Sequence, residues 1–222
     1  MCSSDLPYPF AFPRGERVRT PLAGTSGLAA LIAENDAEAS QALVDQEFQL
    51  LTLYRDSEFW QEAWIRFYRA IFRDAWDRVA DAAFQLERSF RSGAADGPDR
   101  GASDRAFAQN ALSFVQGFTY ERNLDGSDFV NPVTAVTEGR GDCDSRALLW
   151  ALILAQSNIR SGIMVSREYS HAMGLADLPG SGARFDAEGT RWLVAETTSK
   201  VDIGLIAQDK SNADLWLGVV FE

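Results

Sequence analysis

A cysteine at the start of an apolar run is the residue of this sequence best placed to do chemistry. Cys143 lies in the segment Gly-Asp-Cys-Asp-Ser-Arg (141–146), and only apolar residues follow from Ala147 to Ala155. Such a run predicts a buried helix, with Asp142 as its N-cap. The first turn of a helix has unpaired N–H groups and the positive end of the helix dipole, which favour a thiolate. Cys143 is therefore a candidate nucleophile.

Two further residues complete a candidate catalytic triad. His171 is the single histidine of the chain, and it lies in a segment with the alternation of a strand. Glu196 has the matching position in a later predicted strand, so the two side chains can face each other. A carboxylate that accepts the second ring N–H fixes the histidine tautomer and stabilises the imidazolium. The sequence thus predicts thiol acyl transfer by Cys143, His171 and Glu196, with Asp202 as the alternative carboxylate.

Gln116 and Asp142 are candidates for oxyanion binding or substrate positioning. The Gln116 amide could donate to an oxyanion, or it could be a polar residue on an exposed helix face. Asp142 could act only as a helix cap, and its charge beside the thiol would oppose the dipole by raising the thiol pKa. The backbone N–H of Cys143 is a further oxyanion donor. A zinc site is not expected, because one histidine and widely separated cysteines cannot supply its ligands.

The elements that must position these residues divide into helices and then strands. Residues 36–54 and 57–90 have helical spacing, and the second segment is expected to form one long helix whose Trp60, Trp64 and Trp76 could line a cleft. A shorter helix is expected from Ser103 or Asp104 to about Phe118. Beyond the Cys143 helix, the period changes to two, which predicts strands at 163–165, 170–176, 191–197 and 215–221, with a polar connection at 177–189.

This order predicts an α+β fold with an antiparallel sheet. Residues 1–27 contain four prolines and are expected to form an extended arm or tether. Residues 28–222 are expected to form a single domain, in which 28–91 is a helical extension and 104–222 is the catalytic core. The net charge of −11 argues against binding to nucleic acid or to an anionic membrane surface.

Three motifs resemble those of the transglutaminase-like, papain-fold superfamily. They are Gly-Asp-Cys (141–143), His-Ala-Met-Gly (171–174) and Trp-Leu-Val-Ala-Glu-Thr-Thr (192–198), and residues 114–120 also resemble the family's approach to its active site. The similarity covers about 107–206. One departure is Glu196-Thr197, where Asp-Pro is commoner in the family. The resemblance implies a papain-like core in which the Cys-bearing helix packs on an antiparallel sheet.

The resemblance also implies a function. It favours a cysteine protease or amidohydrolase that acts on peptide or protein amides; an amine-acceptor transglutaminase and a catalytically silent papain-fold binding module are the alternatives. No cofactor is expected except calcium, because Asp142 and Asp144 partly resemble the acidic residues beside the cysteine in the family's calcium-dependent periplasmic proteases. The expected partner is a protein or peptide substrate.

The N-terminus suggests a location. Cys2-Ser3-Ser4 resembles the mature end of a bacterial lipoprotein, which would make the chain a cell-envelope protein with lipid on Cys2 as its membrane contact. An ordinary N-terminus of a cytoplasmic protein is the alternative.

Overall fold

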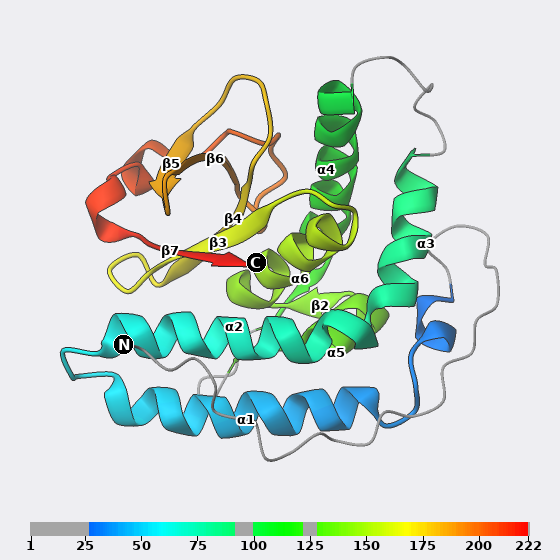
Figure 1. The fold of residues 1–222 in the computed structure, drawn as a ribbon, viewed down its shortest axis with the longest axis horizontal. Helices are drawn as coiled ribbons and strands as arrows, with labels where there is room; N and C mark the ends of the chain where they lie inside the picture. The colour runs from blue at the N-terminus through cyan, green and yellow to red at the C-terminus, as the bar shows by residue number, and fades with distance from the viewer. Residues whose placement is uncertain (1–26, 92–99, 122–127, 222) are drawn as a thin grey trace.

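The computed structural model describes residues 27–91, 100–121 and 128–221 (Figure 1). The predicted N-terminal arm, apart from Gly27, therefore lies outside the described residues. Helices precede an antiparallel sheet along the chain, which confirms the predicted α+β class. Within the described part of the chain, no helix combines the length and the apolar character needed to cross a membrane.

The N-terminal half is helical. A 3-10 turn (Leu28–Leu31) is followed by α1 (Asp36–Tyr54), α2 (Trp60–Arg78), α3 (Ala80–Arg91) and α4 (Arg100–Gln116). Helices α1 and α2 form an antiparallel hairpin along one side of the molecule (Figure 1). Helix α1 has the predicted bounds, whereas α4 begins about one turn earlier than its predicted cap.

The long helix predicted for residues 57–90 is wrong, because the chain bends at Val79 and forms α2 and α3 instead. Val79 is buried, and the guanidinium of the preceding Arg78 is paired with Asp36 and Asp74 inside the protein. The bend lets α2 pack on α1 while α3 packs on α4 and α6. A continuous apolar stripe therefore serves two differently directed helices, which helical periodicity alone does not reveal.

A short helix, α5 (Pro132–Glu138), precedes the cysteine segment and was not anticipated. The Asn131 side chain accepts the Thr134 N–H at 2.9 Å, and proline occupies the first turn, so the start has a strong local signal. Gly139, with φ of 64°, ends the helix. The parallel pair β1 (Thr119–Tyr120) and β2 (Arg140–Gly141) then brings the chain to the cysteine.

The sheet has the order β5-β6-β4-β3-β7, and all neighbouring strands are antiparallel. Its strands are β3 (Ser161–Ser166), β4 (His171–Ala176), β5 (Arg184–Ala187), β6 (Thr190–Ala195) and β7 (Leu217–Phe221). Strand β5 lies inside the segment predicted as a polar connection. The 3-10 turns Gln208–Lys210 and Ala213–Leu215 precede β7, so this strand begins later than predicted.

Helix α6 (Cys143–Gln156) lies between the sheet and the other helices (Figure 1). All side chains from Ala147 to Leu154 are fully buried, as the apolar run predicts. The Trp150 ring packs on Gly174 of β4 so closely that a Cβ there would lie 2.4 Å from the ring, and its N–H donates to the Ala108 carbonyl. This packing fixes α6, and hence Cys143, against the strand that begins with His171.

The opposite face of the sheet covers a second, smaller apolar cluster. It consists of Met164, Met173, Leu175, Phe185, Trp192, Val194, Trp216 and Val220. The cluster confirms that alternate residues of β4 and β6 share one face. His171 opens β4 and Glu196 follows β6, so the pattern leads both residues to the same edge of the sheet.

Candidate active site

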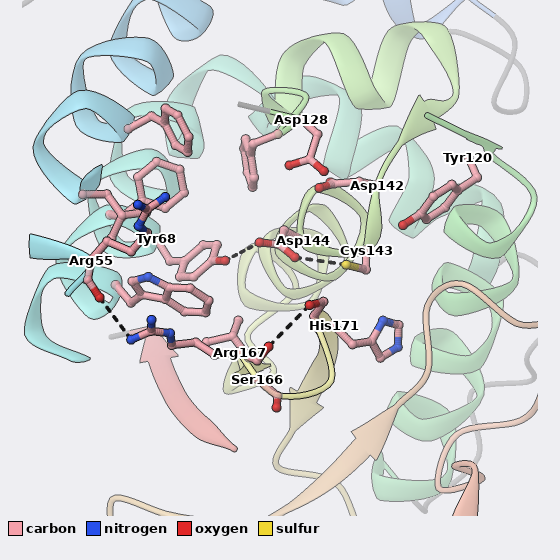
Figure 2. A pocket seen from close by; sticks show the side chains of 17 residues that line it. Arg55, Tyr68, Tyr120, Asp128, Asp142, Cys143, Asp144, Ser166, Arg167 and His171 are labelled. Carbon is pink, nitrogen blue, oxygen red and sulfur yellow. Dashed lines mark hydrogen bonds between the residues drawn. The ribbon is translucent and has the colours of Figure 1, made fainter. Parts of the chain in front are cut away.

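Cys143 is the first residue of α6 and lies in the wall of a cavity of about 310 Å³ (Figure 2). The Asp142 carboxylate caps the helix by accepting the Ser145 N–H at 2.9 Å, as the sequence predicts. The thiol donates to Asp144 Oδ1 at 3.1 Å, and the backbone N–H of Ala172 in β4 donates to Sγ. Cys143 is thus in direct contact with the residue that follows His171.

His171 and Glu196 form a buried pair. The distance between His171 Nε2 and Glu196 Oε2 is 2.8 Å. The other carboxylate oxygen, Oε1, accepts both the backbone N–H of Thr198 at 2.9 Å and its hydroxyl at 2.6 Å. Burial acts to raise the pKa of Glu196, but His171 and Thr198 outweigh it and lower the pKa to about 2. Glu196 is therefore ionised and holds Nε2, which leaves Nδ1 as the base nitrogen.

The structure brings the three predicted residues to one place. Cys143 and His171 line the same cavity, and Figure 2 shows the thiol and the imidazole on the same side of it. Glu196 contacts His171 and is not part of the cavity lining. Asp202 is exposed and does not line this cavity, so the geometry favours Glu196 as the partner of His171.

Gln116 has a different position from the expected one. Its amide nitrogen donates to the Glu196 carbonyl at 2.8 Å and to the Val201 carbonyl at 2.9 Å, and the residue does not line the cavity. In this arrangement both amide hydrogens are used, so none is left for an oxyanion. Gln116 instead holds the chain on both sides of the turn after Glu196 and thereby positions the carboxylate.

Negative charge accumulates around the thiol. Ligand atoms of Asp142, Cys143 and Asp144 lie within 4.8 Å of one another, and Asp128 is close enough to raise the pKa of both carboxyls. Tyr68 of α2 donates its hydroxyl to Asp144 Oδ2. Burial, followed by the charges of Asp144 and Asp142, raises the pKa of the Cys143 thiol well above its ordinary value. The thiol is therefore protonated at rest.

The same cluster has donor chemistry that suits a hard cation. Calcium binds oxygen ligands, with carboxylates prominent among them, and a thiol is not a calcium ligand. Burial, together with neighbouring carboxylates, raises the pKa of Asp142 and of Asp144, so these groups hold their negative charge less readily than exposed carboxylates do. Asp142 and Asp144 thus offer oxygen atoms of the kind that calcium binds, and Asp128 lies near them.

The N-terminal helices supply the apolar side of the cavity. Phe48 and Leu51 come from α1, and Trp64, Phe67 and Tyr68 come from α2. Of the three tryptophans expected near a cleft, Trp64 lines this cavity. Trp60 packs edge-on against the Trp64 ring, with 6.0 Å between the ring centres. Trp76 lines a separate cavity with Arg73. The helical extension is therefore part of the site.

No family model matches the chain, and no curated protein matches it. Among solved structures, the chain aligns with LapG of Legionella pneumophila at 14% identity and a TM-score of 0.36, over 81% of this chain and 83% of that one. An EGTA-treated form of LapG gives 14% and 0.36, with 81% of each chain covered. A calcium-bound form gives 16% and 0.35, with 81% and 83% covered.

Sequence reasoning did not find several residues that support the site. Thr198 belongs to the Glu-Thr-Thr segment, so its contact with Glu196 had a local signal. Arg146 had none: it is buried, and its guanidinium donates to the carbonyls of Gly141 at 3.0 Å and Phe118 at 2.9 Å, which ties β1 and β2 to the start of α6. Tyr68 reaches Asp144 across 76 positions and is equally invisible to local patterns.

Proposed function

We propose that the chain is a thiol-dependent acyl-transfer enzyme of the transglutaminase-like type, a cysteine protease or amidohydrolase that acts on peptide or protein amides. In this proposal Cys143 is the nucleophile, His171 the general base and Glu196 the residue that orients His171. The observation that carries the proposal is the buried 2.8 Å pair of His171 and Glu196 beside a cysteine at a helix start.

The proposed reaction begins with a rotation of the thiol. At rest, Sγ faces Asp144, so it must turn about its Cα–Cβ bond toward His171 before the proton can move to Nδ1. The sulfur then attacks the amide carbonyl carbon, and the C=O electron pair moves onto oxygen. The backbone N–H of Cys143 is the proposed oxyanion donor, because first-turn N–H groups have no acceptor within the helix.

The remaining steps use the same residues. The imidazolium returns its proton to the departing amine, and the C–N bond breaks to leave a thioester on Cys143. Water, deprotonated by His171, then attacks the thioester and releases the acid and the thiol. Glu196 stays ionised throughout, because its pKa is lowered to about 2, so its charge stabilises each imidazolium state.

Alkylation of Cys143 tests the proposal. We expect iodoacetamide to label Cys143 at near-neutral pH, and we expect His171→Ala to slow this labelling at least about tenfold because the base is lost. Labelling is measured by peptide mass spectrometry in a Cys2→Ser background, so that the second thiol does not contribute. Ser170→Ala, beside His171 in the same cavity, is the matched control. Equal rates in wild type and His171→Ala at every pH would refute the pairing.

A catalytically silent binding module remains the rival, and one observation favours it. The thiol is buried and its pKa is raised, which is the state of an unreactive cysteine. The two functions differ in one measurable property. A silent module leaves Cys143 unlabelled at every pH below the unfolding transition, whereas the proposed enzyme shows labelling that depends on His171.

Two features of the environment belong to the same proposal. Calcium held by Asp128, Asp142 and Asp144 would offset the negative charge that raises the thiol pKa, and so would favour the thiolate.

Lipidation of Cys2 would place the protein in the cell envelope; its support is the Cys-Ser-Ser sequence followed by a proline-rich segment. Residues 1–26 lie outside the described part of the structure.

A further inference from the structure

Two arginines lie in the cavity on the far side of Tyr68 from Cys143 (Figure 2). Arg55 directly follows α1, and Arg167 directly follows β3. The Arg167 guanidinium donates to the Arg55 backbone carbonyl at 3.1 Å and lies 5.1 Å from the centre of the Trp60 ring. These contacts hold the Arg167 cation in place before any ligand binds.

Asp56 is the acidic partner of both arginines, and its ion pairs with them are long and exposed to solvent. Asp56 lies 3.5 Å from Arg55 and 3.8 Å from Arg167, and its side chain is 76% exposed. Exposed ion pairs at such distances contribute little to stability, so a ligand carboxylate can replace Asp56 at low cost. The positive charge of the two arginines contrasts with the net charge of the whole chain, which is −11, and with the acidic cluster at the Cys143 end of the cavity. The cavity is thus negative near the thiol and positive at its other end.

Apolar side chains line the same cavity. They are Leu51, Trp64, Phe67 and Phe129, together with the ring of Tyr68, which Figure 2 shows between the arginines and Cys143. A volume of about 310 Å³ is at the lower end of the range of ligand pockets and suits one large side chain of a peptide.

On the basis of the proposed amidase function, we propose that the cavity is a substrate subsite for an acidic peptide. The peptide places a large apolar side chain against Trp64 and Tyr68, and a neighbouring aspartate or glutamate side chain reaches Arg55 and Arg167. The two arginines are then specificity residues that bind substrate without taking part in the chemistry. A lysine at the same peptide position is disfavoured, because it would meet two positive charges.

Peptidyl chloromethyl ketones test this subsite on the full chain. Each reagent contains one phenylalanine, and one of its other positions is occupied by aspartate, asparagine or lysine. The series repeats this substitution at every position. The second-order rate of Cys143 modification is measured by mass spectrometry. At one position we expect aspartate to react about fivefold faster than asparagine, and lysine to react slowest. The double variant Arg55→Met, Arg167→Met should react equally with aspartate and asparagine. Arg167→Glu should invert the order and favour lysine.

Arg73→Met is the matched control, because Arg73 is an exposed arginine of α2 that lines the separate cavity with Trp76. It should keep the wild-type preference for aspartate. If iodoacetamide labelling depends on His171 but no position discriminates aspartate from asparagine, or if the double arginine variant keeps the preference, the subsite is refuted and the proposed function stands. If no reagent labels Cys143 in a way that depends on His171, the proposed function falls and the subsite falls with it.

Discussion

Replacing Glu196 by glutamine removes one charge from the buried pair while nearly preserving its shape. Folding lowers the pKa of Glu196 from its ordinary value of 4.5 to about 2. That difference corresponds to about 3 kcal/mol of favourable interaction, shared between His171 and the two hydrogen bonds from Thr198. Glutamine keeps some of these hydrogen bonds, so we expect Glu196→Gln to lose about 1–2 kcal/mol of unfolding free energy at pH 7.

The pH dependence of this loss has a definite sign. Because the folded pKa lies below the unfolded one, the stabilisation from Glu196 is complete above about pH 5 and is lost as the pH falls toward about 2. The stability gap between wild type and Glu196→Gln should therefore narrow from pH 7 to pH 3. Urea unfolding at both pH values measures it, with the exposed Asp202→Asn as the control that should show no such gap. A gap of equal size at both pH values would refute the account of a charged Glu196.

The same substitution should affect the thiol chemistry, and two other perturbations give independent checks. Glu196→Gln should slow alkylation of Cys143 at least about tenfold at neutral pH, since the imidazolium loses its counter-charge; an unchanged rate would contradict the role of Glu196. Gly174→Ala should cost about 2–3 kcal/mol in urea unfolding because a Cβ would overlap the Trp150 ring, whereas Gly189→Ala, with nothing within 4 Å, should cost about 1 kcal/mol from its positive φ alone. Millimolar calcium should lower the pH of half-maximal alkylation of Cys143, and EGTA should reverse the change. Asp144→Asn should lower the same pH without calcium. Identical pH profiles with calcium and with EGTA would exclude an effect of calcium on the thiol.

Local patterns were sufficient for the parts of the site that local structure positions. The apolar run after Cys143 predicts a buried helix because no face of it can be left in water, and Asp142 is the cap that such a start requires. Alternation along β4 and β6 predicts that His171 and Glu196 contact each other, because side chains on neighbouring strands meet when they share a face. The first prediction depends on an apolar run without a polar face, and the second on the period of two along a strand.

Other features depend on packing between distant segments and could not be read in this way. The bend at Val79 does not interrupt the helical spacing of apolar residues. It is revealed only by the tertiary packing, in which α3 contacts α6 rather than α1. Gln116 has the residue type of an oxyanion donor, but the two carbonyls that it binds lie 80 and 85 positions away. Residue type therefore suggested a chemical role where the fold uses the amide for positioning.

The hydrogen bond from Tyr68 to Asp144 limits how the protein can be divided. It joins α2 to the residue beside the proposed nucleophile, and the neighbouring Phe67 and Ile71 belong to the same apolar core as α6. A fragment that starts at residue 104 would keep Cys143, His171 and Glu196 but would expose this apolar surface and leave the buried Asp144 without its tyrosine partner. The smallest unit that can be expressed or exchanged between proteins with the candidate active site intact must therefore include the helices that precede that fragment.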